Sequence, residues 1–126
     1  MSETKDTNPK DLVGLTKLPL RLVPPVAMAR MAEALENGAS KYGPHNWREF
    51  GVSASVYYEA ALRHLFAWAD GEDEAPDSRV HHLAHAMACL AIMFDAMEIG
   101  KLNDDRPVPG GFTARADAWV NKKEDA

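Results

Sequence analysis

The sequence predicts an all-α fold, a small helical bundle that is completed by further copies of the chain. Three segments carry apolar residues at the three- and four-residue spacing of amphipathic helices, and almost none shows the alternation of a half-buried strand. The 126 residues suffice for one domain with a modest core. Because three medium helices with methionine-rich apolar stripes bury little in one chain, we expect a homodimer or homotetramer.

The first predicted helix begins at Pro24 or Pro25 and ends near Gly38. Proline is tolerated in the first helical turn, and glycine suits the left-handed conformation that ends many helices. The apolar stripe of this helix consists of Met28, Met31, Ala32 and Leu35. Glu33 and Glu36, spaced ExxE, place two carboxylates on one face. A metal-binding role and a solvated role both stay open for them, because surface glutamates often have this spacing.

The second predicted helix begins after Ser53 or Ser55, either of which can cap its N-terminus, and stops at Gly71. The spacing places four apolar residues on one side of it: Tyr58, Leu62, Leu65 and Ala69. Glu59 and Arg63, four residues apart, fall together on another side.

The third predicted helix is capped by Asp77 or Ser78 and ended by Gly100. Five apolar residues repeat at spacings of 4, 3, 4 and 3 and form a seam that faces the core or a partner: Leu83, Met87, Leu90, Phe94 and Met97. Three imidazoles, those of His81, His82 and His85, fall roughly opposite this seam. Ala88 and Cys89 line the same flank, where small side chains permit another helix to approach closely. We therefore expect the imidazoles to face a groove.

The remaining organisation is simple. We predict a flexible polar leader at residues 1–11, a helical domain at residues 12–107 and a C-terminal tail at residues 108–126.

The formal net charge of -5 provides no basic footprint, which argues against a nucleic acid polymer as partner. Cys89 is the only cysteine, so no intrachain disulfide is possible. No apolar run approaches the roughly 18 residues that span a bilayer, so we expect no membrane partner and a cytoplasmic protein.

The stretch GEDEAPDSRVHHLAH, residues 71–85, combines two kinds of metal ligand. Its carboxylates, Glu72, Asp73, Glu74 and Asp77, are the hard oxygen donors that Mg²⁺ or Mn²⁺ prefers. Its histidines place imidazoles one helical turn apart. A solvated acidic loop leading into a helix explains the same residues, because acids near a helix N-terminus stabilise the helix dipole.

Two further stretches carry polar groups suited to a nucleotide. In KYGPHNWREF, residues 41–50, donors stand beside aromatic faces, a mixture that suits a base and its phosphates. The alternative is that Tyr42 and Trp47 anchor a loop onto the helices. In EAALRHL, residues 59–65, Arg63 and His64 are costly to bury in an apolar helix unless paired. They either use a cleft, or Glu59 simply pairs with Arg63.

The order of these motifs resembles a phage and bacterial family of dATP/dGTP diphosphohydrolases, including the MazZ type, grouped with the MazG-like all-α nucleoside triphosphate pyrophosphohydrolases. The likeness runs over about residues 17–107: VPP, a helix, GASKYGPHNWR, AALRHLFAW, GED, PDS, HHLAHA and DDRP. The family pattern is close to GEDxDPESGxxHLAHA. The chain departs from it at Ala75, where the family has Asp, at Asp77, where it has Glu, and at Arg79, where it has Gly.

The resemblance implies hydrolysis of dGTP or dATP to the monophosphate and pyrophosphate, with Mg²⁺ or Mn²⁺, in the host cytoplasm if a phage encodes the chain. We expect Glu72, Asp73 and His64 to be catalytic. The expected metal ligands are Glu59, Glu72, Asp73, Asp77, His82 and His85. The expected nucleotide-binding residues are Lys41, Tyr42, Asn46, Trp47, Arg48 and Arg63. Because position 75 lacks its acid, either Glu74 or Asp77 must complete the metal shell.

Two other functions remain possible on the sequence alone. In one, the chain is a non-catalytic helical module whose Leu83 to Met97 seam binds another protein. In the other, the chain is a nucleotide phosphohydrolase with different products, such as deoxynucleoside and triphosphate. The absence of a His-Asp dipeptide weakens the second alternative.

Overall fold

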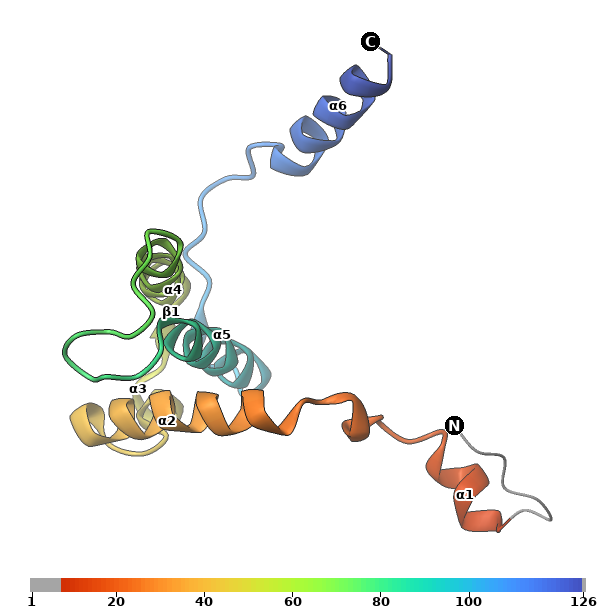
Figure 1. Ribbon diagram of the computed structural model, residues 1–126, viewed down its shortest axis with the longest axis vertical. Helices are drawn as coiled ribbons and strands as arrows, with labels where there is room; N and C mark the ends of the chain where they lie inside the picture. Colours follow the sequence, from red (N-terminus) through yellow and green to blue (C-terminus); the bar gives the residue numbers. More distant parts are fainter. Residues whose placement is uncertain (1–7, 126) are drawn as a thin grey trace.

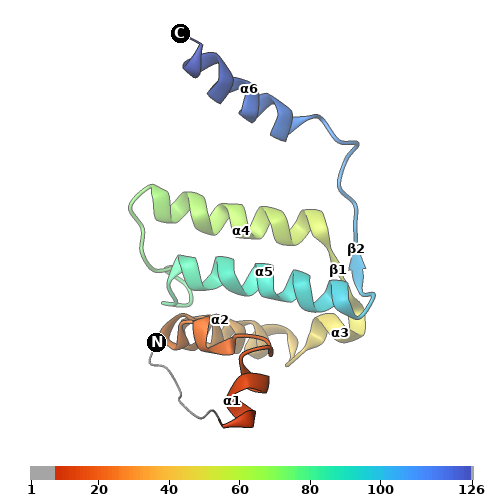
Figure 2. The ribbon, with the colours of Figure 1, turned by 90° about the vertical axis from the view of Figure 1, so that its right-hand side faces the viewer.

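Three long helices form three layers, with α5 (His82–Glu98) between α2 (Pro25–Tyr42) and α4 (Ala54–Ala69) (Figure 2). A computed structural model describes residues 8–125. Four shorter segments precede or connect these helices: α1 (Pro9–Gly14), the 3-10 turn η1 (Leu20–Leu22), α3 (Asn46–Phe50) and β1 (Val52–Ser53). Two more follow: β2 (Leu102–Asn103) and α6 (Phe112–Glu124). The predicted all-α class is confirmed.

Helix α2 begins at Pro25 as predicted but continues past Gly38 to Tyr42. It ends at Gly43, whose φ of 91° favours glycine and whose N–H donates to the carbonyl of Ala39. The predicted apolar stripe was partly wrong. The buried residue is Ala34, flanked by the partly buried Met31 and Leu35, whereas Met28 and Ala32 are exposed.

Helix α4 starts directly after Ser53 and ends before Gly71, as predicted. The side that carries Tyr58 and Leu65 is not the side that packs against the rest of the chain. Its buried residues include Ala61, while Tyr58 is 60% and Leu65 38% exposed. Small residues face α5 because they allow the two helix backbones to approach closely, and the larger ones are left outside.

Helix α5 begins at His82 rather than after Asp77 or Ser78. The ring Nδ1 of His81 accepts the backbone N–H of Leu83 at 3.0 Å and so caps the helix. Residues 77–81 belong instead to a loop that is closed by two backbone hydrogen bonds, from Ala75 N to Val80 O and from Arg79 N to Ala75 O. The helix still ends just before Gly100, as predicted.

The core between the layers is built from alanines. Ala34, Ala84 and Ala88 pack together between α2 and α5, which confirms that the histidine flank of α5 meets another helix through small residues. Among the described residues no large side chain is fully buried. Three residues of the predicted apolar seam, Leu90, Phe94 and Met97, are 50%, 67% and 51% exposed. This part of the seam does not face the core of the single chain.

The short elements were not predicted. Val52 and Leu102 pair in a two-residue parallel ladder between β1 and β2. A Cβ at Gly51 would lie 2.9 Å from the carbonyl oxygen of Lys101, so this approach requires glycine. Residues 1–7 of the predicted leader lie outside the described residues, and α1 begins within the remainder of it. Helix α6 occupies the predicted tail and extends away from the three layers (Figures 1 and 2). Within residues 8–125, no helix has the length and hydropathy of a membrane span.

One loop residue adopts a conformation that glycine adopts more easily. Arg79 has a φ of 63°, and the related family pattern has Gly there. A side chain in the left-handed region costs about 1 kcal/mol, and the exposed ion pair with Glu74, at 3.9 Å, offsets little of this cost. Arg79→Gly should therefore raise the free energy of unfolding in urea by up to about 1 kcal/mol. Arg79→Ala, which keeps the Cβ, should bring no gain; an equal gain would contradict this account.

Candidate active site

A cavity of about 770 Å³ lies where α2, α4 and α5 meet the loop that precedes α3. Pockets for small ligands usually measure about 300–1,000 Å³, so a nucleotide fits in volume. One part of its wall carries charged and imidazole groups that include Lys41, Arg63, His64, Asp77 and His85. Another part is formed by Asn46, Trp47, Tyr57 and Ile92. The cavity thus has a polar region and an aromatic region.

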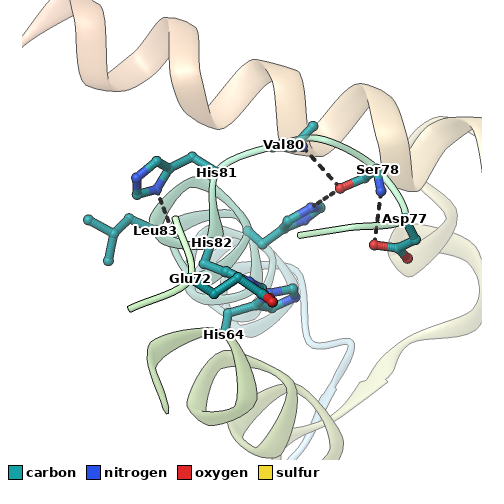
Figure 3. A network of polar contacts seen from close by, with 9 residues as sticks. His64, Glu72, Asp77, Ser78, Val80, His81, His82 and Leu83 are labelled. Carbon is teal, nitrogen blue, oxygen red and sulfur yellow. Dashed lines mark hydrogen bonds and ion pairs between the residues drawn. The ribbon is translucent and has the colours of Figure 1, made fainter. Parts of the chain in front are cut away.

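Three imidazoles and a carboxylate form a connected network at the polar region (Figure 3). His82 is 5% exposed, and its Nε2 lies 2.6 Å from Oε1 of Glu72. Its Nδ1 lies 2.8 Å from Nδ1 of His64. The His64 ring also stacks on that of His85, with centroids 4.5 Å apart.

With a neutral His82, the contacts of the network are consistent with one set of proton positions. The Glu72 carboxylate accepts a hydrogen bond from His82 Nε2–H, so Nδ1 of a neutral His82 has a lone pair. That lone pair accepts the Nδ1–H of His64, which leaves Nε2 of His64 with its own lone pair. Burial, followed by the neighbouring His85 and His82, lowers the pKa of His64 to about 4. The His64 ring is therefore neutral at pH 7 and can accept a proton.

Asp77 lies on the opposite side of this network from Glu72. Its Oδ1 accepts the backbone N–H of Ser78 at 2.9 Å, while the Ser78 hydroxyl lies 2.8 Å from His85 Nε2 (Figure 3). The backbone hydrogen bond from Ser78 lowers the pKa of Asp77, and Lys41 Nζ lies 3.9 Å from its Oδ2. The Asp77 carboxylate is thus ionised at neutral pH and borders the cavity.

Trp47 and Arg48 are held by a carboxylate of α5. Asp95 Oδ2 accepts the indole N–H of Trp47 at 2.7 Å and the Nε–H of Arg48 at 2.8 Å. Asp95 Oδ1 accepts from Nη2 of Arg48, also at 2.8 Å. These hydrogen bonds from Arg48 and then Trp47 lower the pKa of Asp95 to about 2. The clamp joins α3 to α5 and fixes the Trp47 ring in the cavity wall.

The structure distributes the predicted site residues unevenly. Lys41, Tyr42, Asn46, Trp47, Arg63, His64, Asp77 and His85 all line the cavity. Glu59 pairs with Arg63 at 3.9 Å, with both side chains 70% exposed. The backbone carbonyl of Asp73 accepts from His82 N. Glu36, but not Glu33, borders the cavity, and Glu33 lies 3.7 Å from Arg30.

The predicted metal ligands do not converge on one point. Within residues 8–125, no three His, Cys, Asp or Glu side chains stand close enough together to hold a metal ion. Mg²⁺ commonly takes only one or two protein carboxylates and completes its shell with phosphate oxygens and water. The ionised Asp77 carboxylate, at the cavity wall beside Lys41, fits that role.

Sequence reasoning missed two features of the site. Asp95 was not selected, although an acid in the apolar run LAIMFDAM is a signal that it must find a partner. Tyr57 was also overlooked, because its spacing gives no hint that α4 turns this tyrosine, and not Tyr58, toward the cavity.

Comparisons with known proteins show which family the chain belongs to. Residues 7–106 match the family described as dATP/dGTP diphosphohydrolase, N-terminal. The chain belongs to the dATP/dGTP diphosphohydrolase family. It is 32% identical over 98 residues to a dATP/dGTP diphosphohydrolase of Salmonella phage PMBT28, an alignment that covers 75% of this chain and 33% of the phage protein. The chain thus spans about a third of that relative's length. No solved structure matches it.

In the pattern that the sequence resembles, position 75 is expected to carry an acid. Ala75 is only 4% exposed here. Of the two neighbouring acids, Glu74 lies 3.9 Å from Arg79 on the outer side of the loop, whereas Asp77 lines the cavity. Asp77 is therefore the better placed of the two to act on a ligand.

The histidine network makes stability depend on pH. Burial lowers the pKa of both His64 and His85, so the unfolded chain binds more protons than the folded one below the ordinary histidine pKa of about 6.5. The contribution of the two histidines to the free energy of unfolding is complete above that pH. It is lost as the pH falls toward their pKa values in the folded protein. With EDTA present, the melting temperature should be lower at pH 5 than at pH 7. His64→Gln should reduce the difference; an unchanged difference would exclude His64 as a source.

Proposed function

We propose that the chain hydrolyses purine deoxynucleoside triphosphates, dGTP or dATP, to the monophosphate and pyrophosphate. The observation that carries this proposal is the cavity itself, in which two cations, an ionised carboxylate and a neutral imidazole share one wall. Family membership supports the substrate class. Hydrolysis of a phosphoanhydride needs positive charge near the phosphates and a group that takes a proton from water, and this wall provides both.

The residues of the site have different roles in this reaction. Lys41 and Arg63 contact phosphate oxygens and offset their charge. Nε2 of His64 accepts a proton from the attacking water, and the contact with His82 and Glu72 holds the ring in the required tautomer. Trp47 donates its N–H to Asp95, so its ring face is what remains for stacking on the base. Arg48 acts through Asp95 by fixing this wall.

We propose Mg²⁺ or Mn²⁺ as the cofactor. Asp77 would hold the ion, with phosphate oxygens and water completing its shell. Of the other predicted donors, His85 lines the same cavity, whereas Glu72 and Asp73 do not. The bound ion would offset the charge of the triphosphate and polarise a phosphoryl oxygen. Turnover of dGTP and dATP is expected with either cation and is expected to stop in EDTA. Undiminished turnover in EDTA would contradict the metal requirement while leaving the hydrolase proposal intact.

We further propose that the exposed part of the α5 seam packs against a second copy of the chain. Leu90, Phe94 and Met97 border an apolar groove of about 420 Å³. The alanine core of the single chain buries no large side chain fully among the described residues, so pairing would supply the missing apolar burial.

Light scattering after size exclusion should therefore give at least twice the chain mass of 13.9 kDa. Phe94→Glu places a charge in the apolar contact and should shift the protein to the monomer. Phe112→Glu, at an exposed position outside the groove, is the control and should leave the mass unchanged. A monomeric unmodified protein at micromolar concentration would contradict this proposal.

A further inference from the structure

The cavity is ordered along α5, and this order places the parts of a nucleotide. His85 stands at the polar region, Cys89 follows one turn later, and Ile92 lies beyond it. At 1.5 Å per residue, Cys89 is about 6 Å and Ile92 about 10 Å along the axis from His85. Asp95, which holds Trp47, lies about 15 Å from His85 on the same axis. When the phosphates bind at the polar region and the base stacks on Trp47, the sugar between them lies near Cys89.

The wall at this middle level is formed by small apolar residues and one tyrosine. Helix α4 contributes Tyr57 and Ala60, and α5 contributes Ala88 and Cys89. Tyr57 and Cys89 both line the cavity, and burial raises the pKa of the Tyr57 hydroxyl and of the Cys89 thiol. Both groups are therefore uncharged at neutral pH. Ala60 and Ala88 present only carbon there, and Tyr42 is a neighbouring lining residue with a further hydroxyl.

We infer that the Tyr57 ring, which lines the cavity together with Cys89, makes the site select deoxyribose over ribose. This inference rests on the proposed function and names the sugar specificity of the same site. The C2′ methylene of a deoxyribose makes no hydrogen bonds to water, so no hydrogen bond is lost when it contacts carbon atoms of the protein. A 2′-hydroxyl at the same place loses its water and meets the face of the ring, which accepts hydrogen bonds poorly. Ribonucleotides are thus rejected by the cost of desolvating one hydroxyl group.

The test compares deoxyribose and ribose forms of one nucleotide in matched variants of the full chain. Binding of the non-hydrolysable α,β-imido analogues of dGTP and GTP is measured by calorimetry, and kcat/KM is measured with dGTP and GTP. Tyr57→Phe keeps the ring, whereas Tyr57→Ala removes it and admits water. Tyr57→Leu serves as a second ring-free variant that fills more of the space if the alanine protein does not fold. Tyr58→Ala is the control, because Tyr58 is the adjacent tyrosine and faces outward.

The wild type, Tyr57→Phe and Tyr58→Ala should favour the deoxy form by a similar ratio. Tyr57→Ala and Tyr57→Leu should lower that ratio about tenfold, mainly through better binding of the ribose form. An unchanged ratio in both ring-free variants, or a wild type without preference, would overturn the inference. If the wild type binds both analogues but turns over neither substrate, the hydrolase proposal fails, and the binding ratios still decide the role of Tyr57.

Discussion

Asp77→Asn is expected to lower kcat/KM for dGTP about 100-fold, the loss typical of removing one electrostatic group from a phosphoryl-transfer site. The substitution keeps the shape of the side chain and removes its charge. It is expected to leave the fold intact, because an asparagine Oδ1 still accepts the backbone N–H of Ser78. The measurement is kcat/KM of Asp77→Asn with Mg²⁺ or Mn²⁺. The melting temperature of the variant is measured as well, to show that the loss of activity does not come from unfolding.

Glu74→Gln is the matched control for this experiment. Glu74 is an acid of the same loop, but it lies near Arg79 and does not line the cavity. Its substitution should change kcat/KM less than about twofold, in line with the small effect of an exposed ion pair. The opposite result, with Glu74→Gln inactive and Asp77→Asn active, would show that Glu74 replaces the acid that position 75 lacks.

The second large effect is expected at Asp95, far from the reacting phosphates. Asp95→Asn replaces one acceptor oxygen by an amide that donates, so at least one of the three hydrogen bonds from Trp47 and Arg48 is lost. Helix α3 is then held less firmly against α5, and the Trp47 face moves out of position. We expect kcat/KM for dGTP to fall at least about tenfold, chiefly through a higher KM, because small displacements of positioning groups are costly.

Asp104→Asn tests whether this effect comes from joining two helices. Asp104 forms a similar two-point contact with Arg106, and its pKa is lowered to about 2 like that of Asp95. Its partner is only two residues away, so the contact fixes nothing across the fold. Asp104→Asn should leave KM unchanged. Equal losses in both variants would mean that Asp95 acts only as a general surface charge.

The sequence predicted those helix boundaries that are determined by the residues next to them. Pro25 starts α2, and Gly71 and Gly100 follow the ends of α4 and α5, because these residues act on the backbone beside them. The start of α5 was predicted wrongly. Asp77 and Ser78 both have capping side chains, and only the contacts inside the 70–81 loop decide against them.

The faces of the helices and the connections of the site were harder to predict. Periodicity shows which residues share a side of α4 but not which side α5 approaches, so it grouped Tyr58 with other apolar residues and gave no role to Tyr57. Lys41, Arg63 and Asp77 were selected by residue type and motif, and all three line the cavity, while their roles stay predictions. The clamp joins Asp95 to Trp47, which is 48 positions away in the sequence, and to Arg48, which is 47 positions away. No local sequence pattern shows a contact over such a separation.

The most direct test of the proposed function is the identity of the products. Purified protein is incubated with dGTP and, separately, dATP in the presence of Mg²⁺ or Mn²⁺, and the products are separated by ion-exchange chromatography and assigned by ³¹P NMR. Cleavage between the α and β phosphates predicts equal amounts of monophosphate and pyrophosphate. Deoxynucleoside with triphosphate, diphosphate with phosphate, or no turnover of either nucleotide would contradict the assignment of this cavity as a pyrophosphohydrolase site.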